Sequence, residues 1–78
     1  MGWSYDRLWI MLIHKKMKKV ELIRKVGINA SALSRMSKDL PVTLDNLGKI
    51  CKYFNCRLED IIEYVPDEQP EEENPEGI

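Results

Sequence analysis

Residues 18–38 read KKVELIRKVGINASALSRMSK, and this stretch decides the fold of the chain. Its apolar side chains recur at helical spacing on both sides of a single break. Leu22 and Val26 are four residues apart, so they lie on one face of a helix. Leu33 and Met36 are three residues apart and share a helix face in the same way. The stretch therefore predicts two short helices in succession.

The break between these helices has the chemistry of a tight turn. Gly27 is free to adopt the positive φ that ends a helix, and Asn29 can accept a backbone N–H that begins the next helix, expected at residues 30–37. The spacing is that of a helix-turn-helix. Its exposed side carries small or cationic residues that can approach a DNA groove closely, namely Asn29, Ala30, Ser31, Ser34, Arg35 and Lys38.

Charge is segregated along the chain. Residues 1–65 hold twelve Lys and Arg against seven Asp and Glu, so this part carries +5, whereas residues 66–78 hold six acidic residues and carry −6. A basic body favours a polyanionic partner. The lysines of residues 15–19 are interpreted either as contacts to a DNA backbone or as a solvated turn.

The charge division also suggests the domain boundary. Residues 1–65 are enough for one small helical domain, expected to bury roughly 60% of the surface that its unfolded chain exposes. Residues 66–78 are rich in proline and glutamate and are expected to be a disordered acidic tail. The tail either solubilises the protein or folds back on the basic face and competes with DNA.

No feature of the sequence indicates a membrane or secreted protein. The longest apolar run, residues 8–13, is too short to span a bilayer. It precedes a basic cluster, whereas the apolar region of a signal peptide follows one. The chain is therefore expected to be cytoplasmic.

Catalytic and metal-binding patterns are missing from the sequence. His14 is the single histidine and has no Ser or Cys partner, so no enzyme is expected. Cys51 and Cys56 are five residues apart, without a second pair or a nearby His that would complete a zinc site. We interpret them as two half-buried free thiols. No cofactor, metal or small-molecule ligand is expected.

Three further helices complete the expected domain. The first spans Tyr5 to about Lys16 with Ser4 as N-cap, and its wide apolar arc fits two neighbouring elements or one neighbour and a second subunit. A regular amphipathic helix follows an N-cap at Thr43 and stops at Asn55. The last helix covers residues 58–64. No strand is expected, so the predicted class is all-α with five helices.

Two long segments carry a family resemblance. They are LWIMLIHKKMKKVELIRKVGINASALSRM, residues 8–36, and PVTLDNLGKICKYFNCRLEDIIEYV, residues 41–65. Through them the chain resembles the lambda-repressor-like helix-turn-helix family, the Cro/C1-type (XRE) regulators of bacteria and their phages. It is most similar to a small single-domain branch of that family. The resemblance covers residues 5–65 and implies a five-helix DNA-binding domain.

The resemblance also implies roles for individual positions. Lys18 and Lys19 stand where the first paired helix meets phosphate, and residues 27–29 match the turn. The recognition helix would face bases with Ser31, Ser34 and Arg35, and Lys38 would meet the sugar-phosphate chain. Ile23 departs from the family, which often has a small residue there. A larger side chain would widen the helix pair unless it turns outward.

The resemblance and the charge pattern predict a sequence-specific regulator of transcription, a repressor, that binds double-stranded DNA. Arg35 paired with guanine would supply about 1–3 kcal/mol of discrimination, whereas specific binding needs roughly 4–10 kcal/mol over non-specific binding. A homodimer is therefore expected on two half-sites about 34 Å apart. Its surface is expected at the last helix with Tyr64 and Val65. The alternative is a protein-interaction module that kept the fold without DNA readout, which the few base-reading side chains and Ile23 favour.

Overall fold

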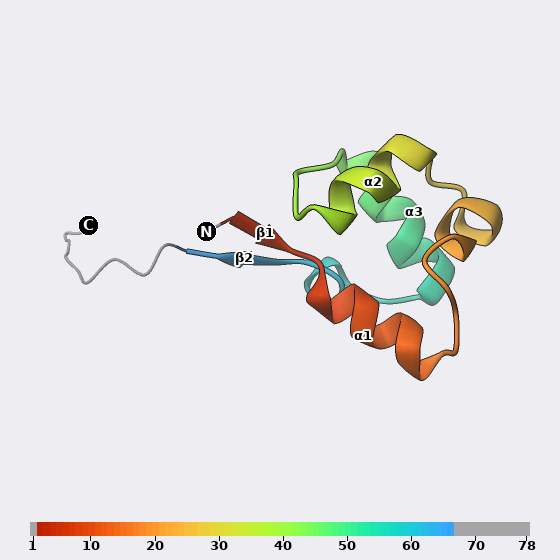
Figure 1. Cartoon of the computed structure of the whole chain (residues 1–78). Coiled ribbons are helices and arrows are strands. Elements are labelled where there is room, and N and C mark those ends of the chain that lie inside the picture. Colours follow the sequence, from red (N-terminus) through yellow and green to blue (C-terminus); the bar gives the residue numbers. More distant parts are fainter. Residues whose placement is uncertain (1, 67–78) are drawn as a thin grey trace.

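The helix-turn-helix lies within a small helical body from which a two-stranded ribbon projects (Figure 1). The computed structural model describes residues 2–66. The predicted disorder of the acidic tail lies outside these residues. In chain order the elements are β1 (Gly2–Ser4), α1 (Asp6–His14), η1 (Leu22–Val26), α2 (Ala30–Ser37), α3 (Leu44–Phe54), η2 (Leu58–Asp60) and β2 (Glu63–Val65).

The two helices of the motif, η1 and α2, form where the sequence predicts them. Gly27 has φ 98°, in the left-handed region, and ends η1. Asn29 is the N-cap of α2, and its side-chain Oδ1 accepts a hydrogen bond from the Ala32 N–H at 2.8 Å. η1 is wound as a π-helix, and the Gly27 N–H accordingly donates to the carbonyl of Leu22, five residues earlier. The predicted turn is confirmed, and the first helix is wider than an α-helix.

α3 also begins and ends at the predicted residues. Thr43 caps its start, accepting the N–H of Asn46 at Oγ1 over 3.3 Å. Asn55 ends it with φ 53°, the left-handed conformation that Asn tolerates better than most residues. Both boundaries depend on local side-chain chemistry, which is why the sequence is sufficient to place them.

The core lies where α1, η1, α2 and α3 meet. Its buried apolar residues come from every helix of the body: Tyr5, Leu8, Leu12, Leu22, Ile28, Met36, Leu47, Ile50 and Ile61. Ile23 is half-buried and packs against this core, so it does not turn outward. Trp9 is also half-buried against the core, whereas Trp3 is exposed on β1.

The chain ends of the domain differ from the prediction. α1 begins at Asp6, with Tyr5 as the N-cap residue, although Ser4 Oγ does accept the Asp6 N–H at 3.3 Å. It ends at His14, and Lys16 adopts a left-handed φ of 57°. The predicted helix over residues 58–64 is wrong. Only Leu58–Asp60 form a 3₁₀ turn, so the five-helix description fails at this element.

The prediction that the chain forms no strand is also wrong. Glu63–Val65 form β2, which pairs antiparallel with β1 in the register Gly2↔Val65. Across the pair, the rings of Trp3 and Tyr64 meet edge to face with centroids 4.9 Å apart. Pairing with a strand about 60 positions away in the sequence overrides the weak local helix preference of these residues.

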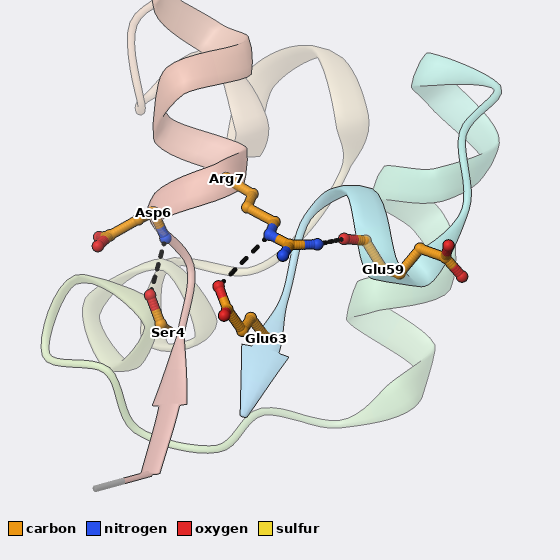
Figure 2. Close-up of polar contacts among 5 residues, drawn as sticks. All are labelled: Ser4, Asp6, Arg7, Glu59 and Glu63. Carbon is orange, nitrogen blue, oxygen red and sulfur yellow. Dashed lines mark hydrogen bonds and ion pairs between the residues drawn. The ribbon is translucent and has the colours of Figure 1, made fainter. Parts of the chain in front are cut away.

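Arg7 joins the ribbon to the helical body. Its Nη1 donates to the backbone carbonyl of Glu59 at 2.8 Å, and its Nε lies 3.4 Å from the Glu63 carboxylate (Figure 2). Both side chains of the ion pair are about half exposed, so the pair contributes at most about 1 kcal/mol. Its main effect is to fix the direction in which β2 leaves the turn η2.

Candidate nucleic-acid interface

A concave surface, which encloses a volume of about 360 Å³, runs along the exposed side of α2 and ends at the start of α3. The loop of residues 38–43 folds back beside α2 and forms its second wall. α2 and α3 can be followed in Figure 1. The residues that line it are Asn29, Ser31, Ala32, Arg35, Pro41, Val42, Thr43 and Asn46. Three of the predicted DNA-contacting residues, Asn29, Ser31 and Arg35, are therefore brought together.

Asn29 and Ser31 are linked at the start of α2. The Asn29 Oδ1 atom accepts the Ala32 N–H, and it also accepts the Ser31 hydroxyl at 2.9 Å. The Asn29 carbonyl oxygen is therefore engaged in capping, and its amide NH₂ is the group that can donate to a ligand. The Ser31 oxygen retains its acceptor lone pairs. This end of the surface offers one donor group, the Asn29 amide, and one acceptor group, the Ser31 hydroxyl oxygen.

Arg35 is held by the neighbouring loop. Its Nε donates to the Pro41 carbonyl at 2.7 Å, and the residue is exposed. This bond uses the side of the guanidinium and leaves the two terminal nitrogens, Nη1 and Nη2, as a fork. Because guanine is recognised by a bidentate contact at O6 and N7, a guanidinium presented end-on and already oriented is suited to it.

The same loop is tied to α1. The buried Tyr5 hydroxyl donates to the Leu40 carbonyl at 2.7 Å. Burial raises the pKa of Tyr5, and the neighbouring carboxylate of Asp39 raises it further, so the hydroxyl stays protonated as a donor. The Leu40 N–H in turn donates to the Arg35 carbonyl at 2.9 Å. These contacts keep the wall of the concave surface in place.

The sequence did not indicate four residues of this surface: Pro41, Val42, Thr43 and Asn46. Asn46 is only 9% exposed, and its Nδ2 donates to Thr43 Oγ1 at 3.0 Å. Thr43 was identified only as a helix cap. The only local indication of a role for Asn46 was its position three residues after the helix cap Thr43. Nothing in the local sequence indicated that the loop brings Pro41 back beside α2.

The other predicted contact residues lie around this surface. Ala30 and Ser34 are exposed on α2, and Lys38 is exposed at its C-cap. Lys18 and Lys19 are exposed just before η1, away from the concave surface. The Lys19 ammonium lies 4.1 Å from the centroid of the Trp9 ring, in a cation–π contact with α1.

Ion pairing does not neutralise these cations within the described residues. The two ion pairs found in residues 2–66 join Arg7 to Glu63 and Lys25 to Glu21. Neither pair involves a residue predicted to contact DNA. In the same part of the chain, no cluster of three or more potential metal ligands occurs. No helix among residues 2–66 is both long and apolar enough to cross a membrane.

Comparison with known proteins agrees with this geometry. The uncharacterized HTH-type transcriptional regulator YozG of Bacillus subtilis (strain 168) is 39% identical over 61 residues, covering 76% of this chain and 73% of the relative. The crystal structure of the transcriptional regulator VanUg, form II, has a TM-score of 0.80 at 42% identity, covering 85% of this chain and 88% of VanUg. Residues 7–67 match the model of the Cro/C1-type HTH DNA-binding domain. The chain therefore belongs to the Cro/C1-type helix-turn-helix family of DNA-binding transcription regulators.

Proposed function

We propose that this protein is a sequence-specific repressor that binds double-stranded DNA as a homodimer, with α2 as the recognition helix in the major groove. The observation that carries the proposal is the concave surface on α2. It presents the oriented guanidinium fork of Arg35 beside the Asn29 amide and the Ser31 hydroxyl. Ala30 and Ser34 leave the helix narrow enough for close approach.

Phosphate contacts would come from both sides of the recognition helix. Lys18 and Lys19 are exposed before η1, and Lys38 is exposed at the end of α2. The start of α3 borders the concave surface, and the N–H groups of a first helical turn attract phosphate. Asp45 in that turn opposes the attraction, so we assign more of the phosphate binding to the lysines.

The homodimer follows from the small number of base-reading side chains. The ribbon supplies an apolar surface for it, because Tyr64 is 50% exposed and Val65 is 43% exposed. They adjoin an apolar hollow of about 240 Å³ lined by Trp3, Tyr5, Pro41, Val42, Leu44, Leu47, Leu58 and Ile62. Pro41 and Val42 line this hollow and the concave surface alike. A second copy seated there would lie beside the DNA-contacting surface of the first.

Selection from random duplexes with the purified full chain tests the proposal. We expect an enriched palindromic site whose half-sites are about 34 Å apart, and an affinity that falls steeply with salt. Reporter expression from a promoter overlapping that site should fall when the protein is supplied. Failure to enrich any sequence, or binding that is insensitive to salt, would refute DNA readout by α2.

A protein-interaction module is the second candidate. The apolar hollow beside Leu44 favours it, because this side chain is 74% exposed and would suit a protein partner other than a second copy. A partner captured with equal efficiency before and after nuclease treatment, from a protein that enriches no duplex, would support this function. Loss of capture after nuclease treatment would assign the interaction to DNA.

A further inference from the structure

The C-terminus of α3 is closed by a Schellman motif. Asn55 adopts the left-handed conformation, its N–H donates to the Lys52 carbonyl at 3.4 Å, and the Cys56 N–H donates to the Cys51 carbonyl at 3.0 Å. In this motif the residues at the two ends of the longer hydrogen bond bring their side chains together. Here both of these residues are cysteines.

The two thiols are neighbours, contrary to what their spacing on a helix suggests. Both are free and half-buried, and both pack against the hydrophobic core. The Cys51 side chain is near enough to raise the pKa of Cys56. Two residues five positions apart on one continuous helix would not share a face. The left-handed Asn55 reverses the chain between them and removes that objection.

We propose that Cys51 and Cys56 form a modification site, a dithiol that a small disulfide such as glutathione disulfide oxidises to an intramolecular disulfide. In the first step one cysteine thiolate attacks a sulfur of the glutathione disulfide, forming a mixed disulfide and releasing one glutathione thiolate. In the second step the other cysteine, as thiolate, attacks the protein sulfur of the mixed disulfide and releases the second glutathione. Two protons leave the protein thiols and end on the two glutathione thiols, whose sulfurs are reduced.

The backbone of the motif favours ring closure over a stable adduct. Because the cap holds the second thiol beside the first, the second step is an attack by a group already in place. Burial raises the pKa of Cys56, and the adjacent Cys51 and then the Asp60 carboxylate raise it further, whereas Lys15 lowers it. Cys56 is therefore mainly a thiol at neutral pH, and exchange should become faster as the pH rises.

The dithiol lies at the opposite end of α3 from the proposed DNA interface. Thr43 is the N-cap and Asn46 lies in the first turn, and the helix has 11 residues, so about 16 Å separates its two ends. The modification is therefore independent of the proposed function, and each can fail without the other.

The experiment uses the reduced full chain incubated with glutathione disulfide and analysed by intact mass after thiol alkylation. We expect the wild type to lose two hydrogen atoms, to take up no alkylating agent and to regain both thiols with dithiothreitol. Cys51→Ser and Cys56→Ser, checked for folding by circular dichroism, should each stop as a stable glutathione adduct.

The wild type alone decides the outcome if either variant fails to fold. A wild-type protein that keeps glutathione, keeps two alkylatable thiols or forms dimers cross-linked by disulfides would overturn the proposal. Running the reaction over a series of pH values adds a second check, since the rate should increase toward alkaline pH.

Discussion

Replacing Arg35 by alanine should remove sequence preference while leaving a folded protein. The Nε contact to the Pro41 carbonyl is exposed, so its loss should cost no more than about 1.5 kcal/mol. A domain of this size has a free energy of unfolding of roughly 3–10 kcal/mol, which is enough to tolerate that loss. The fork of Nη1 and Nη2 is worth about 1–3 kcal/mol per guanine, a factor of about 5–150 in discrimination.

The assay is fluorescence anisotropy with a selected duplex and with the same duplex changed at single guanines. We expect Arg35→Ala to lower the ratio of the two affinities by that factor for each half-site. Arg24→Ala is the matched control, because it removes the same charge from an exposed residue of η1 outside the concave surface. The control should weaken binding to both duplexes alike, or leave it unchanged.

Circular dichroism melting accompanies the assay, so that a loss of folding is not mistaken for a loss of readout. If Arg35→Ala and Arg24→Ala change the affinity ratio equally, Arg35 does not read bases. In that case the contact to Pro41 is structural, and the guanidinium fork has no base partner.

Three further perturbations test other parts of the molecule. Leu44 is 74% exposed and lines the apolar hollow, so Leu44→Glu should convert a dimer into a monomer, as measured by sedimentation. The control is Ile13→Glu, at a residue 72% exposed on α1, and it should leave the dimer intact. Equal masses for the two variants would contradict the proposed dimer surface. Gly27→Ala should lower the free energy of unfolding by about 1–2 kcal/mol in chemical denaturation, because an alanine at φ +98° is strained. The added Cβ would meet no atom within 4 Å, so the strain comes from the backbone alone. An unchanged stability would show that the turn relaxes. Tyr5→Phe should lower the melting temperature by several degrees through loss of the Leu40 hydrogen bond. Because folding raises the pKa of Tyr5, its hydroxyl contributes fully to the free energy of unfolding below about pH 10, and this contribution is progressively lost above that pH. The wild type should therefore lose more stability at alkaline pH than Tyr5→Phe. Parallel curves of stability against pH for the two proteins would contradict this.

The parts of the fold that depend on local chemistry could be predicted from the sequence. Gly27, Asn29, Thr43 and Asn55 each set a helix boundary through their own backbone or side chain, and all four act as expected. The ribbon could not be predicted in this way. Its strands have three residues each, too few for a period to show, and each is stabilised by the other.

The candidate site divides along the same line. Asn29 and Arg35 belong to the helix-turn-helix and were found from its spacing. The contact between Arg35 and Pro41 joins a helix to the loop that follows it, and no rule of helical periodicity reaches across that loop. The thiol pair was missed for a different reason. Asn55 was predicted to end α3, but a helix boundary alone does not show that the hydrogen bond across it joins the backbones of Cys51 and Cys56.

The pairing of Gly2 with Val65 brings the two ends of the folded body side by side. Its first and last described strands run antiparallel about 4.8 Å apart, so the chain enters and leaves at one place. Fusion partners attached at residue 2 and at residue 66 would therefore leave the body on the same side. A short linker from residue 66 back to residue 2 should allow a circular permutant with new ends in the turn after α1. In such a protein the order of the sequence would change while the recognition helix and its supporting loop kept their neighbours.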